Sequence, residues 1–244
     1  SSIEVIYYGL DGTRFDPSSA DGSKVRRALG LRPGQPVIGL VAYFYPPGDS
    51  PRLVPPHLVG KGIKGHEVVL AAIPKVVAAY PDARFVFVGK GWGPLGEAYE
   101  AQVRRLAVDS GVDRHVIFAG ERSDVADTLA SFDVAQQVSL CENLGGSIEA
   151  LTMARPLIAT RVGGLVDSVK DGRTGLLVEP EDPGGLADAI MRLLADRPLA
   201  DRLAQAGREF MLQGFTVQKT CDDLDALCAR LESASTPGYR PMVS

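Results

Sequence analysis

The chain has 244 residues, 45% of them hydrophobic, which is enough to bury one substantial core and excludes a chain that is disordered throughout. Basic residues number 26 against 30 acidic ones, so the net charge of −4 provides no general attraction for nucleic acid or anionic lipid. Any site for an anion must therefore be local. The length allows one large domain or one domain with appendages.

Cysteine content and hydropathy indicate the compartment. Cys141, Cys221 and Cys228 are odd in number and lack the spacing of metal ligands, so we expect reduced structural thiols. The most apolar stretch, residues 68–80, is broken by Pro74 and is shorter than the ~20 residues of a membrane-spanning helix. The chain also starts without the basic and apolar segments of a secretory signal. These features predict a cytoplasmic protein without a transmembrane segment.

Short apolar runs alternate with helical patterns along most of the chain. This rhythm is typical of repeated βαβ units and predicts an α/β fold, a Rossmann-like parallel sheet with helices on both faces. Residues 183–231 have apolar positions at helical spacing and predict helices alone. In chain order, the predicted strands are residues 37–42, 84–88, 116–119, 134–138, 156–160 and 175–178, and the helices between them are residues 67–79, 97–110, 123–131 and 147–153.

The chain divides into three predicted parts. Residues 1–20 form a leading hinge segment, residues 21–232 form the Rossmann-like domain, and residues 233–244 form a loose tail. In doubly wound sheets the ligand lies outside the carboxyl ends of the strands. The loops that follow the strands are therefore the place to look for functional residues.

The loop after the first predicted strand, residues 46–65, is long and rich in proline, and it ends with Lys64 and Gly65 at the start of a helix. A lysine beside the free N–H groups of a helix N-terminus suits a phosphate. A solvated lysine beside a turn explains the same residues. The loop is not a P-loop, because the Gly-Lys-Ser/Thr ending is absent.

A G-x-G-x-x-G pattern at Gly91, Gly93 and Gly96 matches the dinucleotide-binding fingerprint by letter. It does not follow the first strand of the sheet, and no strand ending in an acidic ribose ligand follows at the usual distance. We therefore interpret it as a glycine-rich turn that lines the cleft. A dehydrogenase is the least favoured function.

The loop after residues 134–138 is the most informative. Glu142 precedes the turn at Gly145 and Gly146, and Glu149 lies in the first turns of the next helix. The turn can present N–H groups to a diphosphate, and the two carboxylates can accept hydrogen bonds from the hydroxyls of a sugar and a ribose. A capped helix with Glu149 near its positive end explains the same pattern. No histidine lies near a nucleophile-elbow motif, so a nucleophilic triad is unsupported.

Taken in order, five motifs resemble the C-terminal domain of the family-four retaining glycosyltransferases of the two-domain GT-B fold. The resemblance covers residues 6–231. The motifs are Tyr8-Gly9-Leu10-Asp11-Gly12-Thr13-Arg14-Phe15, Lys64-Gly65, Phe87-Val88-Gly89, Phe118-Ala119-Gly120, and Pro156-Leu157-Ile158-Ala159-Thr160-Arg161-Val162-Gly163-Gly164 with Asp167.

The resemblance implies roles for Lys64 of the second motif and for two glutamates of the loop and helix after residues 134–138. Lys64 compensates the diphosphate of the donor, Glu149 binds the nucleotide ribose, and Glu142 holds the transferred sugar. The donor is a UDP- or GDP-linked sugar, and neither a metal nor another cofactor is expected. Lys64 and Glu142 are thus the candidate catalytic residues, and the donor-binding candidates are Glu149, Asn143, Leu144, Gly145, Gly146, Ser147, Gly120, Arg122 and Tyr43, with base recognition at residues 120–122.

Two departures from the family pattern affect these assignments. Six residues separate Glu142 from Glu149 where the family has seven, so either the loop is one residue shorter or Glu142 is not the sugar ligand. Residues 41–45 also lack the arginine that shares the diphosphate with the lysine in the family. Arg122, Lys61 or the loop at residues 46–65 can replace it, or the donor binds more weakly.

The acceptor-binding N-terminal domain of the family has no counterpart in the sequence, so we expect a fragment or a partner that supplies this half. The complete enzyme can also attach peripherally to a membrane. The isolated chain should bind nucleotide and transfer sugar poorly. Two other functions remain open, a nucleotide-sugar epimerase and a non-catalytic module that binds nucleotide or bridges proteins. The sequence does not identify the base, the sugar, the acceptor or the oligomeric state.

Overall fold

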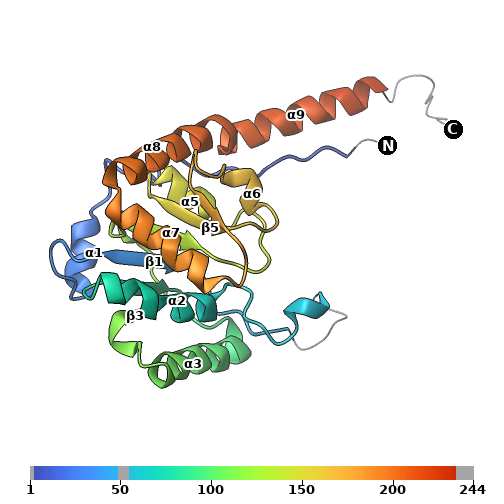
Figure 1. Ribbon diagram of the computed structural model, residues 1–244. Helices are drawn as coiled ribbons and strands as arrows, with labels where there is room; N and C mark the ends of the chain where they lie inside the picture. Colours follow the sequence, from blue (N-terminus) through green and yellow to red (C-terminus); the bar gives the residue numbers. More distant parts are fainter. Residues whose placement is uncertain (1–2, 49–54, 235–244) are drawn as a thin grey trace.

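Six parallel strands form the centre of the structure, a computed structural model that describes residues 3–48 and 55–234 (Figure 1). The strand order is β3-β2-β1-β4-β5-β6, so it reverses between β1 and β4. In such sheets the reversal leaves a crevice outside the carboxyl ends of the central strands. Ile38 pairs with Phe85 on one side and with Val134 on the other. The strands are β1 Val37–Val41, β2 Arg84–Val88, β3 Val116–Gly120, β4 Val134–Gln137, β5 Leu157–Thr160 and β6 Leu176–Val178.

Helices cover both faces of the sheet, as the sequence predicts (Figure 1). One face carries α2, α3 and α7, and the other carries α1, α4, α5 and α6, while α8 contributes to both cores. The helices are α1 Gly22–Ala28, α2 His66–Ala79, α3 Gly93–Asp109, α4 Val125–Ala130, α5 Ser147–Thr152, α6 Leu165–Ser168, α7 Pro183–Ala195, α8 Arg197–Gly214 and α9 Val217–Ala234, with short 3-10 helices η1 Pro56–Leu58 and η2 Asp113–His115.

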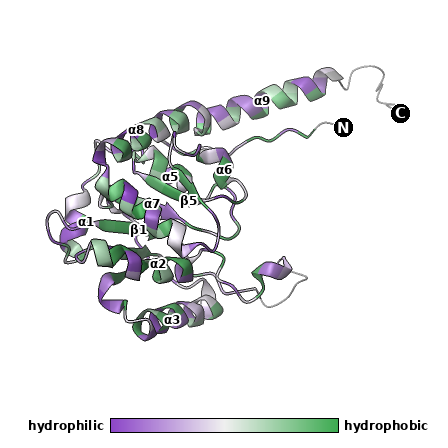
Figure 2. Ribbon diagram, in the orientation of Figure 1, coloured by the Kyte–Doolittle hydropathy of each residue, from purple (hydrophilic) through white to green (hydrophobic). Residues whose placement is uncertain are grey.

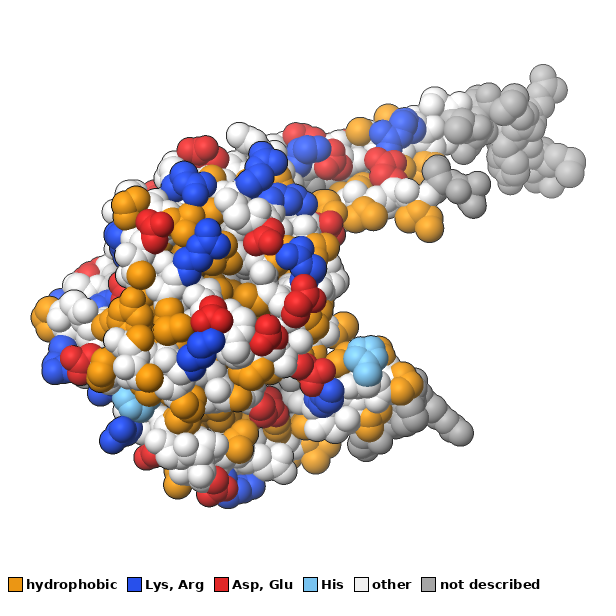
Figure 3. Space-filling model, in the orientation of Figure 1, with side chains coloured by type: hydrophobic (Ala, Val, Ile, Leu, Met, Phe, Trp, Pro, Cys, Tyr) orange, Lys and Arg blue, Asp and Glu red, His pale blue; other side chains and the backbone are white. Residues whose placement is uncertain are grey.

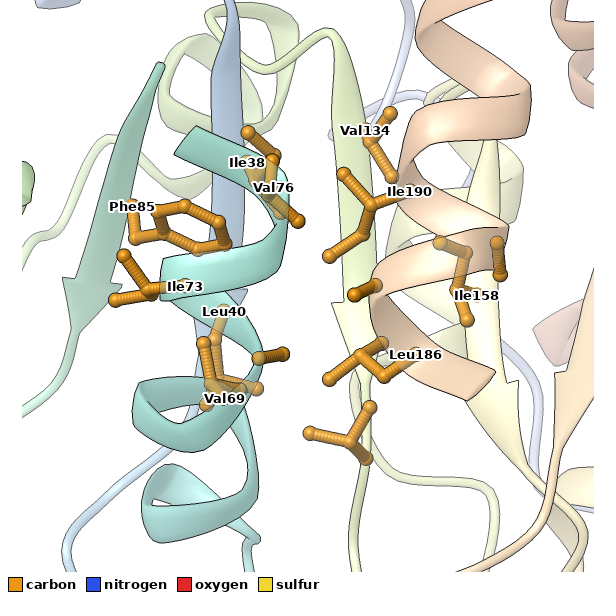
Figure 4. Packing of buried hydrophobic residues seen from close by; sticks show 14 of the residues in the cluster. Ile38, Leu40, Val69, Ile73, Val76, Phe85, Val134, Ile158, Leu186 and Ile190 are labelled. Atoms are coloured by element: carbon orange, nitrogen blue, oxygen red, sulfur yellow. The ribbon is translucent and has the colours of Figure 1, made fainter. Parts of the chain in front are cut away.

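Alternate residues of the strands enter the two cores. Phe85 and Phe87 of β2 pack under α2 and α3, whereas Val86 and Val88 belong to the opposite core. Because both faces are buried, most strand residues are apolar, although β4 ends with the buried Gln136 and Gln137, and Figure 2 shows the hydrophobic colouring of the central elements. Figure 4 shows the first core, in which Leu186 and Ile190 of α7 and residues of α2 meet the strands. Two packed faces hold the carboxyl ends of the strands in fixed positions.

His66 lies at the first position of α2, fully buried in this core. Its ring stacks on Phe44 at a centroid distance of 4.0 Å and meets Phe87 edge-on at 5.3 Å. Burial, helped by the nearby charge of Lys64, lowers the pKa of His66 to about 3. The imidazole is therefore neutral, and its packing against Phe44 and Phe87 holds the start of α2 against the core.

The first and last described segments lie side by side and extend away from the sheet (Figure 1). Thr220 of α9 donates a hydrogen bond to the Tyr7 carbonyl at 2.9 Å, and Arg230 pairs with Glu4 at 2.5 Å. In the space-filling view, a deep indentation separates this arm from the segment that carries η1 (Figure 3). The predicted tail begins at Ser233, and its residues 235–244 lie outside the described part of the chain.

The predicted strands agree with the observed ones within two residues at each end, whereas α1 and α6 were not predicted. The glycines of the G-x-G-x-x-G pattern bring α3 close to the loop after β1. A Cβ at Gly96 would lie 2.5 Å from the Phe44 carbonyl oxygen, and one at Gly91 would lie 2.2 Å from the Glu97 nitrogen. These glycines are therefore required for packing. Among the described residues, no helix is long and apolar enough to span a membrane.

Candidate functional site

A cavity of about 430 Å³ opens at the carboxyl ends of β1, β2 and β4, where the strand order reverses. Its wall combines residues that follow the strands with the start of α5 and a piece of the N-terminal segment. The lining residues are Tyr8, Gly9, Leu10, Val41, Ala42, Tyr43, Tyr45, Lys64, Val88, Gly89, Glu121, Arg122, Val125, Gln137, Gly145, Gly146, Ile148 and Glu149.

Lys64 reaches the cavity from the loop before α2. The next residue, Gly65, has a φ of 73° and passes so close to β4 that a Cβ would lie 2.1 Å from the Val138 carbonyl oxygen. The loop is also tied to the chain after β4, because the Leu140 amide donates to the Ile63 carbonyl at 2.8 Å. The backbone therefore fixes Lys64 next to the loop that carries Glu142.

Lys64 and Glu142 form an ion pair at the edge of the cavity, and their side chains are only 14% and 7% exposed. The Glu142 carboxylate also accepts hydrogen bonds from Gln137 at 3.2 Å and from the Ser139 hydroxyl at 3.0 Å. Lys64 Nζ lies 5.5 Å from the centre of the Tyr45 ring. A buried carboxylate with three side-chain donors is held in one orientation.

Glycines place the Glu142 loop against its neighbours. Gly163, with a φ of 46°, has no room for a side chain, since a Cβ would lie 2.0 Å from the Glu142 carbonyl oxygen. The Gly164 amide donates to that same carbonyl at 3.1 Å. Gly145, with a φ of 48°, lies against the carboxyl group of Glu142, where a Cβ would approach Cδ to 2.8 Å. Substitution at any of these glycines would displace Glu142.

The turn before α5 presents a free donor to the cavity. The Gly145 amide bonds the Asn143 side chain at 2.9 Å, and the Ser147 amide bonds the Leu144 carbonyl at 3.3 Å. Within the described part of the chain, nothing accepts a hydrogen bond from the Gly146 amide, although Gly146 lines the cavity. An anionic oxygen in the cavity would satisfy this donor.

Glu149 lines the cavity one helical turn further along α5. Burial raises the pKa of its carboxyl, and the charge of Arg14 opposes that effect. Among residues 3–48 and 55–234, no group donates a hydrogen bond to this carboxylate. Glu149 is half-buried and faces the open cavity, so ligand hydroxyls that enter the cavity can donate to its carboxylate in place of water.

The opposite wall is a hydrogen-bonded group of three residues from three successive loops. Tyr43 follows β1, Lys90 follows β2 and Glu121 follows β3. The Tyr43 hydroxyl donates to Glu121 Oε1 at 2.8 Å, and Lys90 Nζ lies 2.5 Å from Glu121 Oε2. The ring of Trp92 packs edge-on against Tyr43 at a centroid distance of 5.1 Å.

Two candidate substitutes for the missing arginine are engaged elsewhere. Arg122 lines the cavity, but its guanidinium donates two hydrogen bonds to the Asp124 carboxylate, at 2.9 and 2.6 Å. Lys61 pairs with Glu181 at 2.6 Å. Of the two described cationic side chains that line the cavity, Arg122 pairs with Asp124, whereas Lys64 pairs with Glu142, which is itself a predicted site residue.

The structure brings together six of the sequence-predicted site residues in the cavity wall, namely Lys64, Glu149, Gly145, Gly146, Arg122 and Tyr43. Glu142 lies beside them through its bond to Lys64. The others lie outside the wall: Leu144 and Ser147 are buried, Asn143 is exposed, and Gly120 ends β3 with a φ of 68°.

Several lining residues were missed, notably Gln137, Tyr45 and Val125, whereas Glu121 lies inside the region predicted for base recognition, residues 120–122. Gln137 ends a central strand next to the reversal of strand order, so the rule that ligands bind there could have identified it. The sequence analysis treated Tyr8, Gly9 and Leu10 only as part of a motif. Their position in the cavity wall depends on a long-range contact, the β-bridge between Leu10 and Thr216.

No group of three or more histidine, cysteine, aspartate or glutamate residues is arranged to hold a metal ion in the described segments. Cys141, Cys221 and Cys228 are free and exposed, so they do not contribute to the cores.

Known proteins resemble this chain in sequence. A sequence model of the family "Glycosyl transferases group 1" matches residues 57–196, which is more than half of the chain. D-inositol 3-phosphate glycosyltransferase of Corynebacterium urealyticum is 33% identical over 80% of this chain and 43% of its own length. A GDP-mannose-dependent monoacylated alpha-(1-6)-phosphatidylinositol monomannoside mannosyltransferase of Corynebacterium glutamicum is 33% identical over 85% of this chain and 51% of its own length. The chain thus spans about half the length of these relatives.

Solved structures share the fold. Anabaena HepE, in complex with UDP, superposes with a TM-score of 0.78 at 23% identity, covering 93% of this chain and 57% of its own. Sucrose-phosphate synthase of Thermosynechococcus elongatus gives a TM-score of 0.76 at 27% identity, covering 95% of this chain and 53% of its own. Both are similar to this chain over roughly half of their own lengths.

Proposed function

The chain belongs to the glycosyl transferases group 1, and from this premise we propose that its cavity binds a nucleoside-diphosphate sugar as the donor of a glycosyl transfer. One observation carries the proposal. A cationic side chain, Lys64, and a half-buried carboxylate without a described donor, Glu149, line the same cavity at the point where the strand order reverses. These groups match the two parts of a nucleoside diphosphate, the anionic diphosphate and the ribose hydroxyls.

We assign the diphosphate to Lys64 and to the free amide of Gly146. Entry of the ligand would draw the Lys64 ammonium from Glu142 toward the phosphate oxygens, because a dianion competes with a single carboxylate for the same charge. Glu142 keeps its bonds to Gln137 and Ser139 and turns its freed lone pairs to a sugar hydroxyl. Glu149 then accepts hydrogen bonds from the ribose.

The chemistry that this arrangement supplies is electrostatic. As the anomeric bond breaks, negative charge accumulates on the leaving diphosphate, and a lysine and an amide already directed at it stabilise that charge without reorganisation. Both UDP- and GDP-linked sugars fit these contacts, and the similar proteins include one named as GDP-mannose-dependent and one solved with UDP. Transfer with retention of the anomeric configuration is part of the proposal.

Transfer also needs an acceptor held in line with the donor. The curated relatives are about twice as long as this chain, so we assign acceptor binding to the sequence that they have in addition. The isolated chain should therefore bind the donor and transfer sugar at a small fraction of the rate of a full-length relative. A radiolabelled-sugar assay measures this, and transfer by the chain alone at a comparable rate would contradict the assignment.

Lys64→Ala tests the binding site itself. We expect it to weaken nucleoside-diphosphate binding about 10–100-fold in titration calorimetry, which is the loss for one charge-assisted hydrogen bond of ~1.5–3 kcal/mol. Lys75→Ala is the matched control, because Lys75 pairs with Asp188 on α2 and α7, outside the cavity. Equal affinity in wild type and Lys64→Ala would refute the diphosphate assignment.

A further inference from the structure

Glu121 is a second carboxylate in the cavity wall, on the side formed by the ends of β1, β2 and β3. Tyr43 donates to one of its oxygens at 2.8 Å, and the Lys90 ammonium lies 2.5 Å from the other. Each oxygen has two lone pairs, so each retains one for a ligand. Gly89, Arg122 and Val125 line the same cavity.

The two partners favour the charged form of Glu121 and each contacts one of its oxygens, while 46% of its side chain is exposed. Hydrogen bonds from Lys90 and then from Tyr43 lower the pKa of this carboxyl. Tyr43 is itself fixed by its packing against Trp92 at 5.1 Å. An ionised carboxylate discriminates between ligands by the donors and acceptors that they present.

We propose that Glu121 is a specificity-determining residue that selects guanine, so that the donor is a GDP-linked sugar. This inference rests on the proposed function. Guanine carries two adjacent donors on one edge, the N1–H and the N2 amino group, and both can bond the two oxygens of a single carboxylate. Such bidentate, charge-assisted pairs are the strong and directional ones.

The other bases present the wrong edge to a carboxylate. Uracil has one N–H between two carbonyl oxygens, which the negative charge of Glu121 repels. Cytosine and adenine each have an amino group next to an acceptor nitrogen, so one carboxylate oxygen would meet a lone pair. A bidentate contact to a base discriminates by about 10–100-fold against a base that lacks it.

Titration calorimetry of the 244-residue chain with GDP, IDP and UDP tests the inference. IDP keeps the N1–H and lacks the N2 amino group, so it removes one of the two bonds without altering the protein. We expect GDP to bind about 10–100-fold more tightly than UDP, with IDP between them. In Glu121→Gln, which replaces one acceptor by a donor and removes the charge that repels uracil, GDP affinity should fall, UDP affinity should rise, and the preference for GDP over IDP and UDP should disappear.

Asp188→Asn is the matched control, since Asp188 pairs with Lys75 at 2.7 Å outside the cavity and should leave all three affinities unchanged. UDP binding as tightly as GDP, or equal losses for all nucleotides in Glu121→Gln, would overturn guanine selection and leave the proposed function standing. Failure of every nucleoside diphosphate to bind would overturn the proposed function, and this inference with it.

Discussion

Glu149 illustrates at the scale of one residue how a binding site reduces stability. Its carboxyl is half-buried at the start of α5, partial burial raises its pKa, and no described group donates a hydrogen bond to it. Ionisation therefore costs folding free energy at every pH above the unfolded-state pKa of about 4.5. Under the proposed function this cost is offset when the ribose hydroxyls of the donor bond the charged carboxylate.

Glu149→Gln should therefore stabilise the ligand-free protein at pH 7 while weakening nucleotide binding. Since both states are protonated below pH 4.5, the gain should shrink to nothing as the pH falls through that value. A gain of 1 kcal/mol corresponds to a shift of about 2–4 °C in a chain of this size. Thermal unfolding at pH 7 and pH 4 measures it, with Glu209→Gln on the exposed side of α8 as the control. A lower melting temperature for Glu149→Gln at pH 7 would contradict this explanation.

At the scale of the element, the start of α2 depends on Gly65. This residue combines a φ of 73° with an approach to the Val138 carbonyl that leaves no space for a Cβ. Gly60, in the same loop, has a φ of 75° but open space around it. Comparing substitutions at Gly60 and Gly65 therefore distinguishes the energetic cost of a positive φ from the additional cost of a clash with the Val138 carbonyl.

Gly60→Ala should cost about 1–2 kcal/mol of unfolding free energy, the penalty for a left-handed backbone. Gly65→Ala should cost clearly more and should also weaken nucleotide binding, because α2 must shift away from β4 and take Lys64 with it. Urea unfolding and calorimetry measure the two effects. Equal losses of stability for the two variants would show that the contact with Val138 is unimportant.

The same elements show what the sequence can predict. Strands and long helices were located because their apolar residues repeat at characteristic spacing, as in β2 and α7. The helices α1 and α6 have only 7 and 4 residues, too few for a periodic pattern. Lys64 and Glu149 were found through their motifs, and they line one cavity. The Lys64–Glu142 pair spans 78 positions in sequence, and the Tyr43–Glu121 bond another 78, so only the folded chain reveals them.

At the scale of the whole molecule, the chain is an α/β unit with an open site and a projecting arm. Tyr8, Gly9 and Leu10 belong to the cavity wall, so the N-terminal segment that contacts α9 also borders the proposed binding site. Under the proposed function, the acceptor-binding sequence of the relatives, which are about twice as long, would lie over this open side. Closure over the donor would exclude water and align the acceptor.

The central claim is that the cavity binds a nucleoside diphosphate, and a thermal-unfolding scan of the chain against nucleoside diphosphates, sugar nucleotides and NAD tests it most directly. A ligand at ~100 times its dissociation constant adds ~2.7 kcal/mol, which means a shift of roughly 5–10 °C here. We predict such a shift with GDP or a GDP-sugar, its loss in Lys64→Ala and Glu149→Ala, and no shift with NAD. Unchanged melting temperatures with every nucleotide would contradict the claim and leave the fold without this function.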